Sequence, residues 1–180
     1  MNLKGISSLP VQDADQLLDE AIAQHQAGRL QKAQSLYGSV IALQPDNATA
    51  WIYLGASRRA LGQIKEAVLA LRRAVEIVPD QAGAWFNLGN ALTAQRKWQE
   101  ASDAFDKAVC LEPGLIDAYV NWGDALSRAG RHDAALDVLH LGLSLSPAHP
   151  GLLSNTGNIL LNLHQITEAL PFLENAAEAM

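Results

Sequence analysis

Residues 48–81 read ATAWIYLGASRRALGQIKEAVLALRRAVEIVPDQ, and this 34-residue stretch is one unit of a pattern that runs along the chain. Glycines, alanines and prolines each recur at steps of 34 residues without a slip. Three residue types that keep one register predict a stack of similar units instead of one central core. The series are Gly55, Gly89, Gly123 and Gly157; Ala33, Ala67, Ala101, Ala135 and Ala169; and Pro45, Pro79, Pro113 and Pro147.

Each unit predicts two helices. In residues 48–81, apolar residues follow helical spacing up to Leu61, Gly62 interrupts, and a second apolar face ends before Pro79. Proline cannot continue a helix and disfavours the α conformation in its predecessor. We therefore expect an all-α protein, with first helices at 14–27, 48–61, 82–95, 116–129 and 150–163 and second helices at 30–43, 64–77, 98–111, 132–145 and 166–179.

The repeated residues have steric roles. A glycine in a helix interior costs about 1 kcal/mol relative to alanine, so four at one register require a reason. The simplest reason is close approach of the partner helix, and we expect the alanine series to face these glycines there. Large side chains fill the wider gaps, and Trp85 is expected to be buried. Pro171 is expected near the start of the last helix, where it does not break the helix.

The same residues carry a resemblance to a known family. The pattern Trp85–Leu88–Gly89, Ala101, Phe105, Ala108 and Pro113, with its counterparts in the other units, resembles the tetratricopeptide repeat. The resemblance implies an α-solenoid, a right-handed superhelix of antiparallel helix pairs. An N-terminal extension, 1–13, would precede five repeats at 14–47, 48–81, 82–115, 116–149 and 150–180. The chain departs from the pattern with Ala21 at the helix glycine, and with Arg96 and His164 at the turn glycine.

Composition excludes several classes of function. The chain has 180 residues, is 49% hydrophobic and carries a formal net charge of −6, with eleven acidic and five basic residues in 91–180. Nucleic acids and anionic membranes bind basic surfaces, so neither is an expected partner. One cysteine allows no disulfide within the chain. No stretch approaches the ~20 apolar residues that span a bilayer, and we expect a cytoplasmic protein.

Two columns of polar residues lie on the first helices, which line the concave face in the family that the chain resembles. Residues three apart on a helix point the same way, so the columns form two rows of donors and acceptors suited to an extended peptide backbone. The rows resemble those of the O-linked N-acetylglucosamine transferase family. The alternative is that they satisfy polar groups of the repeat itself. The residues are Asn87, Asn121 and Asn155, and Asn90, Asp124 and Asn158.

Units one and two lack these rows, so their part of the groove is expected to be more apolar. Leu18, Ile52 and Phe86 recur at steps of 34 and form either a pocket for one anchor side chain or a partly buried seam between repeats. Arg59 and Arg128 are the only bases that we place on the inner face. Some family members hold a terminal carboxylate with a clamp of lysines and asparagines. Apolar or small residues at the matching places exclude such a clamp here.

No catalytic, cofactor or metal site is predicted. The sequence contains no glycine-rich phosphate loop, and its five histidines form no pair at metal-binding spacing. Cys110 lies between Val109 and Leu111, which predicts a buried, inert thiol, and His140 is expected to be half-buried.

The sequence therefore predicts a non-catalytic protein–protein interaction module that binds an extended segment. One alternative is a substrate-recruiting N-terminal arm of a larger glycosyltransferase or sulfotransferase, since the opening unit resembles those found ahead of such domains in bacterial proteins. Another is a scaffold that self-associates through its leucine-rich C-terminal repeat. Asp13 is expected to cap the first helix. We also expect the chain to be truncated at its C-terminal end.

Overall fold

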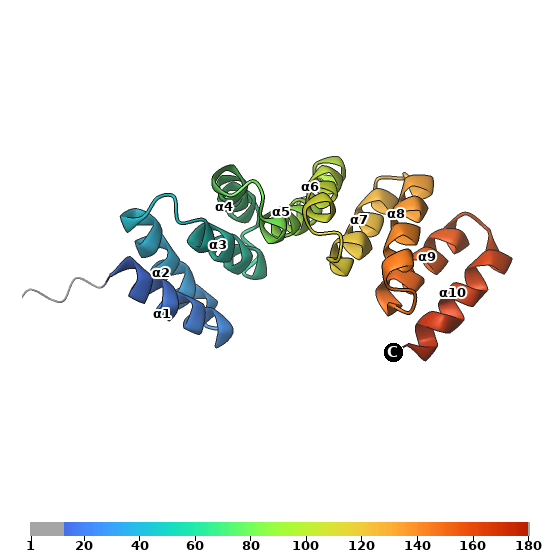
Figure 1. Ribbon diagram of the computed structural model, residues 1–180, viewed down its shortest axis with the longest axis horizontal. Helices are drawn as coiled ribbons and strands as arrows, with labels where there is room; N and C mark the ends of the chain where they lie inside the picture. The colour runs from blue at the N-terminus through green and yellow to red at the C-terminus, as the bar shows by residue number, and fades with distance from the viewer. Residues whose placement is uncertain (1–12, 180) are drawn as a thin grey trace, which may run out of the picture.

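The computed structural model describes residues 13–179, which form ten helices in five antiparallel pairs (Figure 1). Each expected helix is present, with ends within one residue of those predicted. Part of the expected N-terminal extension and Met180 lie outside the described residues. The helices are α1 (Ala14–Gln26), α2 (Leu30–Leu43), α3 (Ala48–Ala60), α4 (Ile64–Ile77), α5 (Ala82–Ala94), α6 (Trp98–Leu111), α7 (Ile116–Arg128), α8 (His132–Leu145), α9 (Pro150–Asn162) and α10 (Ile166–Glu178).

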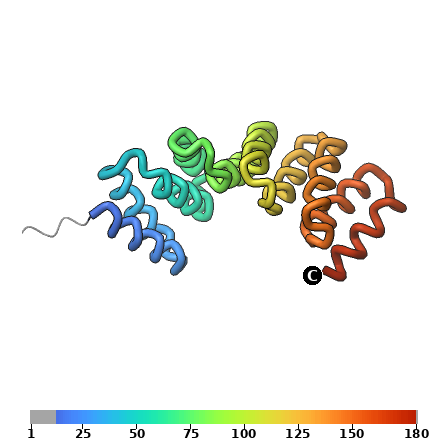
Figure 2. The backbone as a smooth tube through the Cα atoms, in the orientation of Figure 1, coloured from blue at the N-terminus to red at the C-terminus, as the bar shows by residue number. Residues whose placement is uncertain are grey.

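The pairs follow one another along an elongated, curved path, as the backbone trace shows (Figure 2). Each helix packs against the next one along the chain. In addition α1 contacts α3, α3 contacts α5, α5 contacts α7 and α7 contacts α9, whereas within residues 13–179 no second helix contacts another second helix. In a curved stack, the helices on the inner side lie closer together than those on the outer side, so the row of first helices that contact one another is the inner row. The first helices therefore line the concave face, and the fold is the expected α-solenoid.

The tight turn inside each repeat requires a residue with positive φ. Gly62 has φ 76°, and the N–H of Gln63 beyond it donates to the Arg58 carbonyl at 2.9 Å. This six-to-one bond belongs to the Schellman motif, in which glycine is favoured at the left-handed position. Arg96 and His164 adopt φ of 60° and 61° at the same place, although a side chain disfavours that conformation.

The helix glycines make room for a side chain, which corrects the expectation that alanines would face them. A Cβ on Gly89 would lie 2.6 Å from the Phe105 ring, and one on Gly55 would lie 2.5 Å from Leu71. The large residues assigned to wider gaps therefore occupy the closest contacts. The alanines of the series are nevertheless fully buried in the core.

Trp85 is only half-buried, contrary to expectation. Its indole Nε1 donates to the Pro79 carbonyl at 2.8 Å, and Trp51 makes the same bond to Pro45. Each bond ties a first helix to the loop that precedes it. The polar edge of the indole must reach that loop, so the ring cannot enter the core completely.

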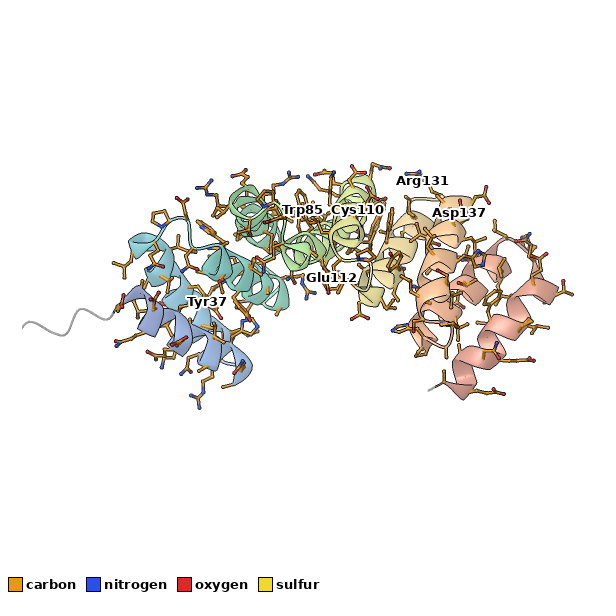
Figure 3. All side chains as sticks on the ribbon, viewed as in Figure 1. Tyr37, Trp85, Cys110, Glu112, Arg131 and Asp137 are labelled. Carbon is orange, nitrogen blue, oxygen red and sulfur yellow. The ribbon has the colours of Figure 1, made fainter. Side chains whose placement is uncertain are left out.

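Three further expectations concern single residues. Asp13 occupies the N-cap of α1, but its side chain makes no capping hydrogen bond, so the expected cap is wrong in its interaction. Pro171 lies inside α10, one turn deeper than a helix-start residue, and the helix continues to Glu178 as expected. Cys110 and His140 are both exposed, so both burial predictions are wrong; Figure 3 marks Cys110 on α6.

Candidate functional site

The first polar row bonds within the protein. The amide Nδ2 of Asn87 donates to the Gly83 carbonyl at 2.9 Å, and that of Asn155 donates to the Val120 carbonyl at 3.1 Å. Asn121 Nδ2 donates to Asn90 Oδ1 in the neighbouring first helix at 2.8 Å. Each of the three side chains is half-buried. The donors of this row therefore orient the face, while the Oδ1 atoms of Asn87, Asn121 and Asn155 remain as acceptors.

The second row is more accessible toward the C-terminal end. Asp124 Oδ2 accepts from Arg128 Nε at 2.7 Å along α7, and this carboxylate raises the pKa of the Arg128 guanidinium. Arg128 also lies over the Trp98 ring, 5.9 Å from its centroid. Asn158 on α9 is exposed. Much of the charge of Asp124 is thus offset, and Asn158 offers a free amide.

A polar pocket of about 150 Å³ lies between α7 and α9. We call it the α7–α9 pocket. It brings together three residues of the predicted rows and adds others that the sequence did not single out. Its lining is Asp124, Ser127, Asn155, Asn158, Ile159 and Asn162.

A second and larger pocket, of about 310 Å³, opens further toward the N-terminus on the same row of first helices. We call it the α3–α5 pocket. Its walls come from the C-terminal end of α1, one face of α3 and the first turns of α5. The lining residues are His25; Thr49, Ile52, Tyr53 and Ala56; and Gln81, Gly83 and Asn87.

The apolar residues expected to recur in this region are only partly in the pocket. Ile52 lines it, whereas Leu18 and Phe86 pack against the core as partly buried side chains. The Phe86 ring lies 6.1 Å from that of Phe105. Arg59 is exposed at the end of α3 and Arg128 at the end of α7, and neither lines either of the two pockets.

An aromatic cluster supports one wall of the α3–α5 pocket. The rings of Tyr37 and Tyr53 stack at 5.8 Å, and the His25 ring meets Tyr53 edge-on at 5.5 Å. His25 Nδ1 and the buried Ser57 hydroxyl share a hydrogen bond of 2.9 Å. Burial lowers the pKa of His25, because desolvation disfavours the charged imidazolium.

Tyr37 is the buried member of this cluster. Figure 3 marks it on α2, where its side chain is completely buried. Burial, together with the nearby Tyr53, raises the pKa of its phenol. Among residues 13–179 it holds the one buried side-chain oxygen or nitrogen without a hydrogen-bond partner. The repeat pattern contains no signal for this cluster, because His25 and Tyr37 occur once each at their places in the repeat.

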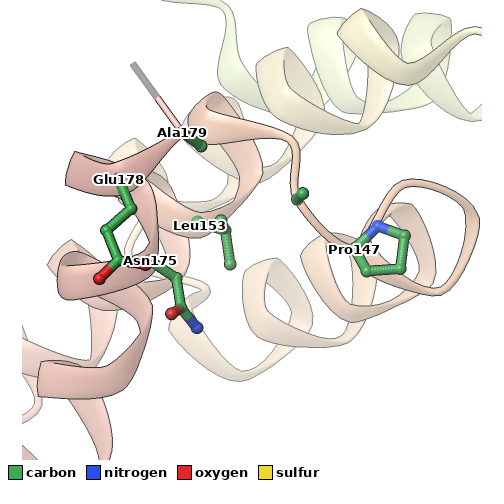
Figure 4. A pocket seen from close by; sticks show the side chains of 6 residues that line it. Pro147, Leu153, Asn175, Glu178 and Ala179 are labelled. Carbon is green, nitrogen blue, oxygen red and sulfur yellow. The ribbon is translucent and has the colours of Figure 1, made fainter.

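Two other cavities lie elsewhere. One of about 310 Å³ is lined by residues of α4, α5 and α6, among them Arg72, Glu100 and Lys107. Lys97 and Arg72 hydrogen-bond to Glu100 and lower its pKa. The other, of about 360 Å³, lies where the end of α10 meets the loop between α8 and α9, beside Pro147 and Leu153 (Figure 4).

Residues 13–179 contain no cluster of three or more histidine, cysteine, aspartate or glutamate side chains that could hold a metal ion. Over the same described range, no helix has the length and apolar character needed to cross a bilayer.

Comparison with known families agrees with the repeat. A family model described as "TPR repeat" matches residues 55–95, and one described as "Tetratricopeptide repeat" matches residues 82–115. Residues 55–115 therefore match models of the tetratricopeptide repeat. No curated protein sequence matches it.

Solved structures show the same fold. A crystal structure of MamA protein aligns with a TM-score of 0.84 at 23% identity, over 92% of this chain and 91% of that one. Another MamA crystal structure aligns with a TM-score of 0.82 at 24% identity, over 88% of this chain and 93% of that one. The crystal structure of YrrB aligns with a TM-score of 0.80 at 22% identity, over 93% of this chain and 87% of that one. YrrB is described as "a TPR protein with an unusual peptide-binding site". At these identities the likeness extends to the fold alone.

Proposed function

We propose that this tetratricopeptide-repeat chain is a non-catalytic interaction module that binds an extended peptide or protein segment along its first helices. The observation that carries the proposal is the presence of two pockets on that one row, between α3 and α5 and between α7 and α9. YrrB, a TPR protein with an unusual peptide-binding site, supports a similar use of this fold.

The spacing of the pockets gives the length of the bound segment. Neighbouring packed helices lie about 8–10 Å apart, so two steps along the first helices separate the pockets by roughly 16–20 Å. An extended chain advances about 3.3 Å per residue, so about five or six residues link the two points of contact. The acceptor of Asn121, which bonds to Asn90 of α5, lies between them, and that of Asn87 lines the α3–α5 pocket. Both suit the N–H groups of a peptide backbone.

The experiment uses a phage-displayed library of random peptides, each about twelve residues long, which is enough to span both pockets. Selected peptides are then measured against variants by isothermal titration calorimetry. Asn158→Ala combined with Asn162→Ala removes two exposed amides of the α7–α9 pocket without breaking a bond inside the protein. We expect affinity to fall by about tenfold, the effect of losing one or two hydrogen bonds.

Asp137→Ala is the matched control, because Asp137 is exposed on the second helix α8 (Figure 3). It should leave the affinity unchanged. If no selected peptide responds to the double variant, or if all respond equally to both, the α7–α9 pocket is not a point of contact and the two-pocket proposal fails. The roles proposed for Asp124 and Asn155, which line the same pocket, would then fail with it.

Self-association through the fifth repeat is a second candidate function. Its observation is a set of apolar side chains exposed on α9 and α10, namely Leu161 at 38%, Ile166 at 57% and Leu170 at 49%. Light scattering over a concentration series tests it, since a constant monomer mass would contradict it. The role as an arm of a larger transferase remains a prediction from the sequence.

We also propose a cytoplasmic location and exclude nucleic acid and membrane as partners. The exposed, free thiol of Cys110 suits a reducing compartment. The net charge of −6 disfavours phosphate-rich surfaces.

A further inference from the structure

The α3–α5 pocket is lined without a single lysine, arginine, aspartate or glutamate. We propose that it holds one uncharged, mainly apolar side chain of the bound segment, of the leucine, methionine or phenylalanine class, and so fixes the register of that segment. This inference rests on the proposed function, since it names what the concave face selects.

The repeat register shows that this pocket replaces part of the polar rows. Tyr53 stands 34 residues before Asn87, at the place that holds asparagine in the next three repeats. Ala56 stands 34 residues before Asn90, at the place of the second row. Where both polar positions become a ring and a methyl group, the face gains an apolar wall. A segment that bonds to the amide rows through its backbone therefore meets a change of chemistry at α3.

The charges of the other cavities give the contrast. The α7–α9 pocket contains the Asp124 carboxylate, and the cavity among α4, α5 and α6 contains Arg72, Glu100 and Lys107. A charged side chain placed in the α3–α5 pocket would lose water and gain no opposite charge, which is strongly unfavourable. An apolar side chain gains free energy in proportion to the area that it buries. The polar groups of the exposed residues Thr49 and Gln81, which also line the pocket, remain for the peptide backbone.

The wall is preorganised. The His25 ring is held by the Ser57 hydroxyl and packs edge-on against Tyr53, which in turn stacks on the buried Tyr37. Side chains that are already fixed lose little conformational entropy when a ligand arrives. The pocket can thus accept a side chain without rearrangement of its aromatic wall.

Gly83 gives direct access to this pocket by mutation. It lies in the first turn of α5 and lines the pocket, and a Cβ built on it meets nothing within 4 Å. Gly83→Leu therefore fills the cavity from its edge with no clash at the Cβ. Gly38→Leu is the matched control, because Gly38 is exposed in α2 and its Cβ likewise meets nothing within 4 Å.

The test uses four blocked amino acids as probes and follows backbone amides by NMR. N-acetyl-leucinamide and N-acetyl-phenylalaninamide should shift the Gly83 and Asn87 amides with millimolar dissociation constants, and the lysine and aspartate probes should bind about tenfold more weakly or not at all. Gly83→Leu should abolish the shifts from the leucine probe, Gly83→Ala should reduce them, and Gly38→Leu should leave them unchanged.

Equal shifts from all four probes would overturn the inference, as would leucine shifts that survive in Gly83→Leu. Gly83→Ala keeps the test valid if the larger substitution perturbs folding, since alanine is favourable in a helix. The peptide titrations fail or succeed separately. Peptide binding that depends on Asn158 and Asn162, together with no preference among the probes, would leave the proposed function intact and refute the apolar pocket alone.

Discussion

The first and third repeats have the same two helices but differ at the positions that matter most for packing and binding. In the third repeat Gly89 leaves room for the Phe105 ring, and the inner face carries Asn87 and Asn90. In the first repeat Ala21 stands at the glycine position and Tyr37 at the phenylalanine position. The scaffold therefore tolerates exchange at its closest contact, and the residues on its inner face can vary from repeat to repeat.

The largest expected effect comes from removing the ring that fills the third repeat. Phe105 is completely buried, so Phe105→Ala should lower the free energy of unfolding by about 3–5 kcal/mol. Trp85→Ala in the same repeat should cost clearly less, because Trp85 is half-buried. Urea denaturation of both variants makes the measurement. Equal losses of unfolding free energy in the two variants would show that the cost of truncation does not depend on how deeply the side chain is buried.

A substitution at Gly89 makes the third repeat resemble the first. Gly89→Ala places a Cβ 2.6 Å from the Phe105 ring, so we expect a loss of about 1–3 kcal/mol from overpacking. Gly83→Ala in the same helix meets no atom and should gain up to about 1 kcal/mol from helix propensity. Thermal unfolding of the two variants, measured side by side, shows whether Gly89→Ala lowers and Gly83→Ala raises the stability. A stabilising Gly89→Ala would mean that Phe105 moves aside at no cost.

The opposite exchange removes the unpartnered hydroxyl of the first repeat. Tyr37→Phe keeps the buried ring and deletes an oxygen that lacks a hydrogen bond, so stability should rise by about 1 kcal/mol. Tyr53→Phe is the control on the neighbouring, half-buried ring and should change stability less. A loss of stability in Tyr37→Phe, seen in urea denaturation, would reveal a bond to the hydroxyl.

The turns of the two repeats can also be exchanged. Arg96→Gly gives the third repeat the glycine that the first has at Gly28, where φ is 72°. Relief of the left-handed conformation is partly offset by the entropy of glycine in the unfolded chain, so we expect a gain of about 0.5–1 kcal/mol. Differential scanning calorimetry measures it, with Arg131→Gly, beside a turn glycine, as a control that should bring no gain.

The smallest expected effect is a pH dependence confined to the first repeat. The pKa of His25 is lowered in the folded state, so the unfolded chain binds the proton first, at its ordinary value near 6.5. The neutral imidazole therefore stabilises the fold above that pH, and this contribution is lost as pH falls through the lower folded pKa. Urea denaturation between about pH 7.5 and 5.5 should show a smaller decline in His25→Thr than in the wild type. His140→Gln, an exposed histidine, should decline like the wild type.

The sequence predicted the helices because five copies of one unit reinforce each boundary. It placed Cys110 wrongly because neighbours on a helix point in different directions, so a buried Val109 says nothing about the next side chain. It placed Trp85 wrongly because its hydrogen bond to a loop carbonyl is not visible in apolar spacing.

The candidate site was harder to predict than the helices, because the repeat pattern identifies only the residues that the repeats share. The polar rows repeat at steps of 34 and were found from the sequence, and three of their residues meet in the α7–α9 pocket. The α3–α5 pocket depends on His25, Tyr53 and Gly83, each of which departs from its counterparts in most other repeats. A pattern that identifies shared residues has no information about such exceptions.

The indole bonds to the loop prolines make the joints of the array unequal. Trp51 and Trp85 secure the first two joints, whereas Leu153, which offers no donor, takes that place at the last one. Heat should accordingly fray the array from its C-terminal end, and amide protons of α9 and α10 should exchange with solvent sooner than those of α5.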